Sequence, residues 1–389
     1  MRTSYKSTHR GRRRNFGGKR SFKAKKVAYH KFINKNPKNV IPSEYIPKNT
    51  FSDFVFDKQI LENLNRKRYV NPTHIQDESI PHILKGKDII GLANTGSGKT
   101  AAFILPIIQK VLLTKDNVLI ITPTRELAEQ IQNEFIQFSN RMSMYSVLCV
   151  GGLNINLQIR ALRRNPNVII GTPGRIKDLM NRNSLELKNT KTLVLDEFDS
   201  MLDMGFLPDV KNILSNLPEK RQSLCFSATI SDDIERILQS IVVNPVRISV
   251  RTSETGEHIA QDVIKARTKE AKLKELVNML EQDHFEKVLV FGQMKYSVQR
   301  LSNTLSKMGF KSVAIHGNKS QPQRQRALKE FKEGKANILV ATDVAARGLD
   351  IPNVSHVINF DQPQTHQEYV HRIGRTGRAG KPGQAYTFV

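Results

Sequence analysis

The sequence predicts an α/β protein with two parallel-sheet domains in tandem behind a disordered, basic N-terminal tail. Short, continuous apolar runs that end in Gly, Pro, Asp or Ser/Thr alternate with amphipathic stretches, a rhythm typical of repeated βαβ units. A polar segment at residues 251–256 interrupts this rhythm, which then starts again. The first 48 residues lack the rhythm altogether.

The tail is predicted to span residues 1–48. The chain of 389 residues has a formal net charge of +25, and Met1 to Ser43 contain fourteen Lys or Arg and no Asp or Glu. Because the tail is also poor in large aliphatic residues, it cannot bury enough surface to offset its chain entropy, and we expect disorder. Residues 10–18 interleave Arg, Gly and Phe, which suits loose contact with RNA. A solubilising tail and a targeting signal are the alternatives.

Two domains follow, at residues 49–250 and 257–389, joined by a linker at residues 251–256. In the first domain we expect strands at residues 88–93, 118–123, 146–150, 168–173, 192–197 and 223–229. In the second we expect strands at residues 287–292, 312–317, 337–343, 356–361 and 385–389. Parallel sheets of this kind bind ligands at the carboxyl ends of their strands.

Composition narrows the class of protein. Cys149 and Cys225 each lie in an apolar run, and their number and spacing fit neither a disulfide framework nor a zinc site. This favours a reducing compartment, and we expect the cytoplasm. No apolar run is long enough to span a bilayer, and the N-terminus has no secretory h-region. The positive charge favours a polyanionic partner, with nucleic acid ahead of a membrane surface.

A glycine-rich loop between a predicted strand and a predicted helix indicates a nucleotide site. It consists of Ala93, Asn94, Thr95, Gly96, Ser97, Gly98, Lys99 and Thr100. The glycines let backbone N–H groups turn inward around phosphate, and the helix N-terminus adds partial positive charge. Lys99 can reach the β- and γ-phosphates of ATP, and Thr100 can ligate Mg²⁺. The alternative is a glycine-rich turn without nucleotide, which the strand–loop–helix context disfavours.

A pair of carboxylates supplies the other half of such a site. The apolar run at residues 192–195 delivers Asp196 to its end, where this carboxylate should hold Mg²⁺ through water. Glu197 follows directly and is placed to activate the attacking water. Alone, an acidic pair at a strand end is more often a helix cap or a solvated turn; beside a phosphate-binding loop, the metal interpretation is favoured.

With these two elements in place, the chain resembles the DEAD-box helicases of helicase superfamily 2. The resemblance runs from Phe51 to Val389 and rests on motifs in the family's order. In the first domain they are NPTHIQ (71–76), ANTGSGKT (93–100), PTREL (123–127), GG (151–152), TPGR (172–175), DEFD (196–199) and SAT (227–229). In the second they are SQPQR (320–324), ATDVAARGLD (341–350) and HRIGRTGR (371–378). The resemblance implies two RecA-like domains that bind ATP and RNA.

It also implies roles around the nucleotide. Gln76 would read adenine, because an amide can both donate to and accept from that base. Phe51 would stack on the base, with a core aromatic as the alternative. Asp350 would contact the ribose, while Arg375 and Arg378 would contact the γ-phosphate, Arg378 as the arginine finger. His371 and Arg372 would couple this loop to DEFD and SAT. The expected catalytic residues are Lys99, Asp196, Glu197, Arg375 and Arg378.

RNA contacts are implied at small residues or phosphate-binding donors, which suit backbone recognition without sequence readout. They are Thr124, Arg125, Gly151, Gly152, Thr172, Arg175, Arg324 and Thr342. For the small residues, a turn at a strand end is the alternative.

The chain departs from the family at several positions. Phe198 stands in DEFD at the place where the family usually has Ala. A ring in place of a methyl group must displace its neighbours, and this puts the coupling of hydrolysis to unwinding in question. Arg68 replaces a usual Gly, His74 replaces a common Pro, and the chain ends directly after a predicted strand, which points to a fragment.

We expect an RNA-stimulated ATPase that acts as a monomer and locally separates RNA duplexes or remodels RNA–protein complexes. The sequence identifies no protein partner. An ATP-gated RNA clamp with weak unwinding is the main alternative. A DNA translocase of the same superfamily is a third, which the adenine-reading motif and the near-complete motif set disfavour.

Overall fold

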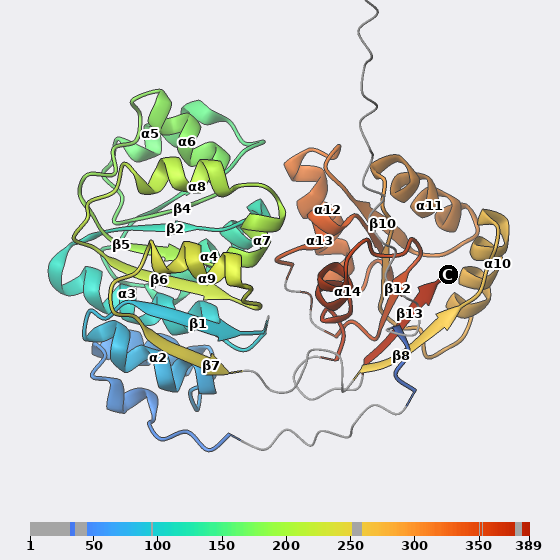
Figure 1. The fold of residues 1–389 in the computed structure, drawn as a ribbon, viewed down its shortest axis with the longest axis horizontal. Coiled ribbons are helices and arrows are strands. Elements are labelled where there is room, and N and C mark those ends of the chain that lie inside the picture. Colours follow the sequence, from blue (N-terminus) through green and yellow to red (C-terminus); the bar gives the residue numbers. More distant parts are fainter. Residues whose placement is uncertain are drawn as a thin grey trace, which may run out of the picture.

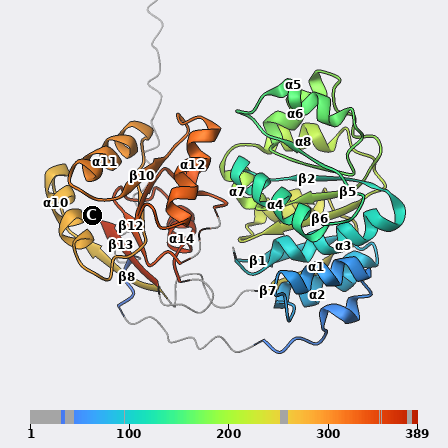
Figure 2. The same cartoon turned by 180° about the vertical axis from the view of Figure 1, so that it is seen from behind.

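Two α/β domains make up the structure, a computed structural model that describes residues 32–35, 45–94, 96–250, 259–349, 351, 353–377 and 383–389. Each domain is a parallel sheet with helices on both faces, and the two domains lie side by side (Figures 1 and 2). The predicted fold class is therefore confirmed. Within the described ranges, no helix is both long and apolar enough to cross a membrane.

The first domain contains a sheet whose described strands are ordered β3-β4-β2-β5-β6-β1-β7, all pairs parallel. The strands are β1 (Ile89–Ala93), β2 (Asn117–Ile121), β3 (Ser146–Cys149), β4 (Val168–Gly171), β5 (Thr190–Leu195), β6 (Gln222–Ser227) and β7 (Val246–Val250). A short 3-10 helix (Phe51–Phe54) and nine α-helices are described with them. The helices are α1 (Lys58–Arg66), α2 (His74–Leu84), α3 (Lys99–Thr114), α4 (Arg125–Phe138), α5 (Ile155–Leu162), α6 (Pro173–Asn181), α7 (Phe198–Asp203), α8 (Leu207–Leu214) and α9 (Asp232–Gln239).

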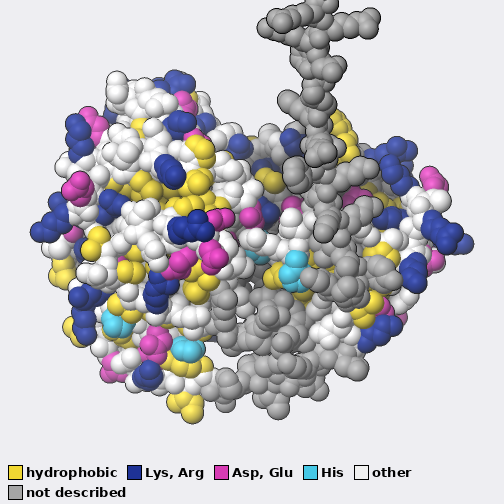
Figure 3. Space-filling model, in the orientation of Figure 1, with side chains coloured by type: hydrophobic (Ala, Val, Ile, Leu, Met, Phe, Trp, Pro, Cys, Tyr) yellow, Lys and Arg dark blue, Asp and Glu magenta, His cyan; other side chains and the backbone are white. Residues whose placement is uncertain are grey.

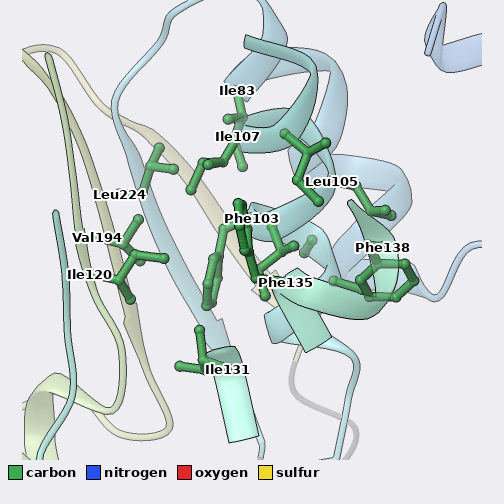
Figure 4. Packing of buried hydrophobic residues seen from close by; sticks show 14 of the residues in the cluster. Ile83, Phe103, Leu105, Ile107, Ile120, Ile131, Phe135, Phe138, Val194 and Leu224 are labelled. Carbon is green, nitrogen blue, oxygen red and sulfur yellow. The ribbon is translucent and has the colours of Figure 1, made fainter. Parts of the chain in front are cut away.

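Apolar packing covers both faces of this sheet. Val118 and Ile120 of β2 belong to one core cluster, and Leu119 and Ile121 to another. Successive strand residues point to opposite faces, so a strand covered on both sides must be apolar throughout. Figure 4 shows one of these faces, where side chains from α3 and α4 pack against side chains from β2, β5 and β6.

The second domain repeats the plan. Its described strands are ordered β10-β11-β9-β12-β13-β8, again with every pair parallel. The strands are β8 (Ile259–Ile264), β9 (Val288–Phe291), β10 (Ser312–Ile315), β11 (Ile338–Ala341), β12 (His356–Asn359) and β13 (Gly383–Phe388). The helices are α10 (Lys269–Leu280), α11 (Lys295–Lys307), α12 (Gln321–Lys332), α13 (Asp343–Ala346) and α14 (His366–Ile373).

Two strands were not predicted, β7 and β8. Each lies at an edge of its sheet and is only partly buried, so polar residues interrupt its apolar ones and no continuous apolar run forms. The predicted linker at 251–256 lies outside the described residues, between the end of β7 and the start of β8.

The predicted tail at 1–48 lies largely outside the described residues as well. Two described stretches within it make specific contacts. Phe32 is buried in the core of the second domain, and Tyr45 donates a hydrogen bond to Asp77 of the first. Within the tail predicted to be disordered, residues 32–35 and 45–48 therefore have defined positions in the structure.

Candidate nucleotide and RNA site

The predicted motifs meet at the carboxyl ends of the strands in both domains. In the first domain, β1 leads into the glycine-rich loop, β5 into Asp196, and β6 into the SAT motif. In the second, β11 leads into Thr342 and α13. This is the edge at which open parallel sheets bind ligands.

The glycine-rich loop turns sharply before α3. Gly96 and Gly98 have φ angles of 85° and 93°, a left-handed conformation that glycine adopts without strain. Lys99, the first residue of α3, folds back so that its Nζ donates a hydrogen bond to the carbonyl of Ala93 at 2.6 Å. The hydroxyl of Ser97 is buried and has no hydrogen-bond partner among the described residues. An inward-turned loop with an orphaned donor fits a phosphate ligand.

Gln76 packs directly on this loop. Its Nε2 donates to the carbonyl of Gly98 at 3.0 Å, and its Oε1 accepts from the backbone N–H of Thr73 at 2.9 Å. A Cβ atom at Gly98 would lie 2.5 Å from the Gln76 Nε2, so the contact requires glycine. Gln76 is only 1% exposed, and adenine recognition would have to use the second amide hydrogen and the second oxygen lone pair.

Phe51 belongs to the core of the first domain. It is 5% exposed and meets the rings of Phe54 and Tyr69 at centroid distances of 6.1 and 6.2 Å. This placement favours the core aromatic over base stacking.

Asp196 and Glu197 lie at the end of β5, buried in the first domain. Burial raises the pKa of Asp196 to about 7, and the positive charge of Lys99 opposes that rise. A buried carboxylate of this kind gains by holding a cation. Glu197 has φ 51° and ψ 52°, the left-handed conformation that begins α7 and sets the direction of its side chain.

Asp199, the last residue of DEFD, joins three motifs. Its Oδ2 accepts hydrogen bonds from the backbone N–H groups of Ala228 and Thr229 and from the Thr229 hydroxyl, at 2.8 to 3.2 Å. The Nε2 of His371, on the second domain, lies 3.9 Å from the same oxygen. Burial lowers the pKa of His371 to about 4, although Asp199 acts in the opposite direction, so the imidazole is neutral at pH 7.

Arg372 does not share this cross-domain contact. Its guanidinium binds both carboxylate oxygens of Asp343, at 2.5 and 2.7 Å, within the second domain. It also donates to Asn359 and to the carbonyl of Asp361. The expected coupling to DEFD and SAT therefore passes through His371, and Arg372 instead ties α14 to α13.

The remaining nucleotide residues of the second domain are only partly described. Arg375 is buried and donates to the carbonyl of Leu349 at 2.8 Å, so its guanidinium lies within its own domain. Arg375 also lines a small hollow together with Arg347, Glu368 and His371. Thr95, Asp350 and Arg378 lie outside the described residues.

The predicted RNA residues of the first domain cluster at the ends of β2, β3 and β4. Arg125 lies over the glycine doublet: a Cβ atom at Gly152 would fall within 2.2 Å of the Arg125 Nη1. The Nη1 of Arg175 donates to the carbonyl of Leu153 at 3.3 Å. Burial is the main cause that lowers the pKa of Arg175, and the positive charge of Arg125 lowers it further. Thr124 and Thr172 precede the first residues of α4 and α6.

Arg324, a predicted RNA residue of the second domain, faces the first domain, and Thr342 precedes the first residue of α13. Arg324 pairs with Glu126. A Cβ atom at Gly348, six residues beyond Thr342, would lie 2.8 Å from the Thr124 hydroxyl. Two predicted RNA residues on different domains, Thr124 and Arg324, therefore both lie at the interface.

Several residues at this interface were not predicted. Gln367 donates to the Thr229 hydroxyl at 3.4 Å, and Arg347 lies 3.5 Å from Asp203. Gln367 and Asp203 stand outside every motif, whereas Thr229 stands inside SAT and Arg347 inside ATDVAARGLD. Glu126 stands inside PTREL.

On the face drawn in Figure 3, surface charge does not indicate where RNA or ATP would bind. There, Lys and Arg side chains are scattered over both domains and interspersed with Asp and Glu. Contacts at the strand ends therefore locate the site better than net charge does.

A P-loop, paired carboxylates in DEFD and a second RecA-like domain that contacts the same motif at Asp199 define a helicase-type nucleotide-binding protein. The DEAD/DEAH box helicase family matches residues 73–237, and the helicase conserved C-terminal domain matches residues 269–380. The ATP-dependent RNA helicase CshA of Listeria monocytogenes is 48% identical over 342 residues, which are 87% of this chain and 66% of that protein. CshA of Bacillus subtilis is 44% identical over 343 residues, 87% of this chain and 69% of that protein.

Among solved structures, S. cerevisiae Dbp5 bound to RNA and ADP BeF3 matches with a TM-score of 0.78 at 30% identity, over 87% of this chain and 89% of that one. The chain therefore belongs to the DEAD-box helicase family. It spans slightly less than two thirds of the length of the Listeria protein.

Proposed function

We propose that this protein is an ATP-dependent RNA helicase that couples ATP hydrolysis to local duplex unwinding or to remodelling of RNA–protein complexes. The observation that carries the proposal is the contact of His371 with Asp199, which joins the second domain to the carboxylate cluster. Asp199 in turn holds the SAT motif through Thr229. The names of the relatives support the same activity, and the solved Dbp5 complex supports RNA and ATP as ligands.

ATP would be held by the residues of the glycine-rich loop. We assign Lys99 to the β- and γ-phosphates, and Thr100 and Asp196 to Mg²⁺. Bound Mg²⁺ would neutralise negative charge on the phosphates and polarise the transferred group. Glu197 accepts the proton of the attacking water. Gln76 supports the loop from α2, as its hydrogen bond to Gly98 indicates.

Arginines of the second domain complete the ATP site. We assign Arg375 and Arg378 to the charge that develops on the γ-phosphate, with Asp350 at the ribose. Arg375 must leave the carbonyl of Leu349 to reach a phosphate. Exchange of that neutral acceptor for an anion is favourable, because charge-assisted hydrogen bonds are the stronger ones.

RNA would bind across both domains by its backbone. On the first domain we assign Thr124, Arg125, Gly151, Gly152, Thr172 and Arg175. On the second we assign Arg324 and Thr342. Glycines admit the strand closely, and the arginines pair with phosphates. Since both ligands use both domains, binding of one favours the closure that the other needs.

We also propose a cytoplasmic location. Cys149 and Cys225 are both buried free thiols in the structure, which supports a reducing compartment.

A strand-displacement assay on matched RNA and DNA duplexes, with and without ATP, tests the function. The proposal expects ATP-dependent separation of short RNA duplexes and no separation of DNA duplexes. ATP-dependent RNA binding without displacement would favour the clamp, and separation of DNA would favour a translocase. A Glu197→Gln variant is the control for displacement that does not need hydrolysis.

A further inference from the structure

Residues 32–35, here called the N-terminal anchor, pair with the edge strand of the second domain. The backbone N–H of Asn34 donates to the carbonyl of Gln261 at 2.8 Å, and the N–H of Gln261 donates to the carbonyl of Asn34 at 2.9 Å. Strand β8 pairs with β13 on its other side. The anchor therefore adds an antiparallel bridge to an edge that the sheet itself leaves open, as in binding by β-augmentation. It lies beside β8 in both ribbon views (Figures 1 and 2).

An aromatic side chain fixes the anchor. Phe32 is 1% exposed and belongs to the apolar core of the second domain, whereas Ile33 beside it is 40% exposed. The Phe32 ring lies 4.5 Å from the ring of Tyr369. Lys35 pairs with Asp262 at 3.4 Å, but both side chains are well exposed, and such pairs contribute little. Burial of Phe32 and the backbone pair are thus the main attractions.

The anchor reaches the helix that carries the catalytic motif. Tyr369 lies on α14, two residues before His371, and its hydroxyl donates to Oε1 of Gln261 at 2.7 Å. Gln261 is the residue that pairs with Asn34. Phe32, Gln261 and Tyr369 therefore form one packed unit, through which the anchor steadies α14.

The same N-terminal segment is also held by the first domain. The Tyr45 hydroxyl and the Lys48 N–H both donate to Oδ2 of Asp77, at 2.5 and 2.7 Å. The Tyr45 ring stacks on His74 at a centroid distance of 4.2 Å. Both His74 and Asp77 lie on α2, which carries Gln76. One segment thus contacts both domains beside their ATP motifs.

We propose that the N-terminal anchor binds the second domain in cis and that the segment thereby forms a second connection between the domains, beside the linker after β7. Nine residues, 36–44, join its two contact points, which limits their separation to about 35 Å. Docking of Phe32 therefore opposes wide opening of the domains and favours the arrangement in which His371 meets Asp199. The occupant of the β8 edge is this chain's own segment.

Hydrogen exchange of the full-length protein without ligands tests the docking. In the wild type, the Gln261 amide is protected by its bond to Asn34. Phe32→Ala should raise the exchange rate of that amide at least about tenfold. Asn34→Pro, which removes one backbone donor without leaving a cavity, should do the same. Ile33→Ala is the matched control and should exchange like the wild type. Unchanged exchange in both Phe32→Ala and Asn34→Pro would overturn the docking.

Energy transfer between the domains tests the second connection. Cys149 and Cys225 are buried, so dyes can be placed on Arg160→Cys of α5 and Lys307→Cys of α11, two exposed positions on different domains. Without ligands, Phe32→Ala should increase the widely separated population at least about twofold over Ile33→Ala. Superimposable distributions for the two variants would overturn the second connection even if the exchange result held. Neither measurement depends on the proposed activity.

Discussion

Arg324 of the second domain lies with its Nε 2.8 Å from Oε1 of Glu126 in the first domain, and the two side chains are only 10% and 5% exposed. Gln321 adds hydrogen bonds to Glu126 and Glu129. Burial raises the pKa of Glu126, and the charge of Arg324 opposes the rise. A nearly buried ion pair is costly to break from one side, because the remaining charge is left without a partner.

Glu126→Gln should therefore destabilise the closed arrangement that binds RNA. We expect the RNA concentration for half-maximal ATPase to rise about tenfold, which corresponds to roughly 1.4 kcal/mol. Arg324→Gln should raise it at least as much, since it also removes a proposed phosphate contact. In the double variant, the loss should be clearly smaller than the sum of the single losses. ATPase titrations with RNA measure all three, and additive losses would show that the pair does not join the domains.

Glu197→Gln separates binding from hydrolysis. The amide keeps the shape of the side chain but cannot accept a proton from water, so turnover should fall at least about 10²-fold. ATP and RNA binding should be retained, and the complex with both should be long-lived. Glu186→Gln, an exposed position in the same domain, is the matched control. Near-normal ATPase in Glu197→Gln would remove Glu197 from its proposed role.

The structure shows where the ring of Phe198, which stands in DEFD in place of the usual Ala, is packed. Its ring is fully buried in the core cluster of the first domain that contains Met201 and Leu195. The added volume is thus taken up by the apolar core beneath the sheet. Phe198→Ala should lower the free energy of unfolding by about 3–5 kcal/mol, as measured by urea denaturation. Phe198→Leu should cost less and leave RNA-stimulated ATPase close to that of the wild type. A stable Phe198→Ala variant with lost ATPase would place the ring in the site instead.

His356 should make the second domain sensitive to acid. Burial lowers its pKa to about 4, with the charge of His284 contributing, while its hydrogen bond to Gln384 acts in the opposite direction. An unfolded histidine takes up its proton near pH 6.5. The unfolded state therefore binds more protons between pH 6.5 and 4, and stability falls as the pH drops through that window.

The loss attributable to His356 should reach about 3 kcal/mol at pH 4 and vanish above pH 7. Denaturation at several pH values, compared with His356→Gln, isolates this loss from that of His371, whose pKa is also lowered by burial. Parallel stability curves for the two proteins would contradict the assignment.

Sequence reasoning reached those parts of the fold that are specified locally. Continuous apolar strands such as β2 are recognisable because both faces are covered, and the turns of the glycine-rich loop require residues without a side chain. Arg68 stands where a glycine is usual, and its φ of 58° gives the reason for that glycine, because the position needs a left-handed backbone.

The contacts that sequence reasoning missed are set by tertiary structure. Strands β7 and β8 are half-exposed at sheet edges, so their patterns are weak. Gln367 meets Thr229 only because two domains come together, and no spacing in the sequence reports that. Phe32 lies in a basic, polar segment, and its burial depends on an open strand edge more than 200 residues away, at Gln261.

The basic segment before the anchor supplies the last prediction. Residues 1–31 contain twelve Lys or Arg and no acidic residue, and we expect them to bind RNA backbone by releasing counterions. On single-stranded RNA, each neutralised phosphate contributes about −0.7 to the slope of log affinity against log salt. If half of these basic residues engage, deletion of residues 1–31 should flatten the slope by roughly four units.

Because that deletion keeps Phe32 and every motif from Phe51 onward, turnover at saturating RNA should stay close to that of the full chain. The RNA concentration for half-maximal ATPase should rise, most clearly at low salt, where unscreened phosphates attract the tail most strongly. Replacing the twelve basic residues with Gln, in place of deleting them, should reproduce the effect and so separate charge from length. RNA affinities of the three proteins across a salt series decide the matter. Equal slopes would leave the segment with a targeting or solubilising role.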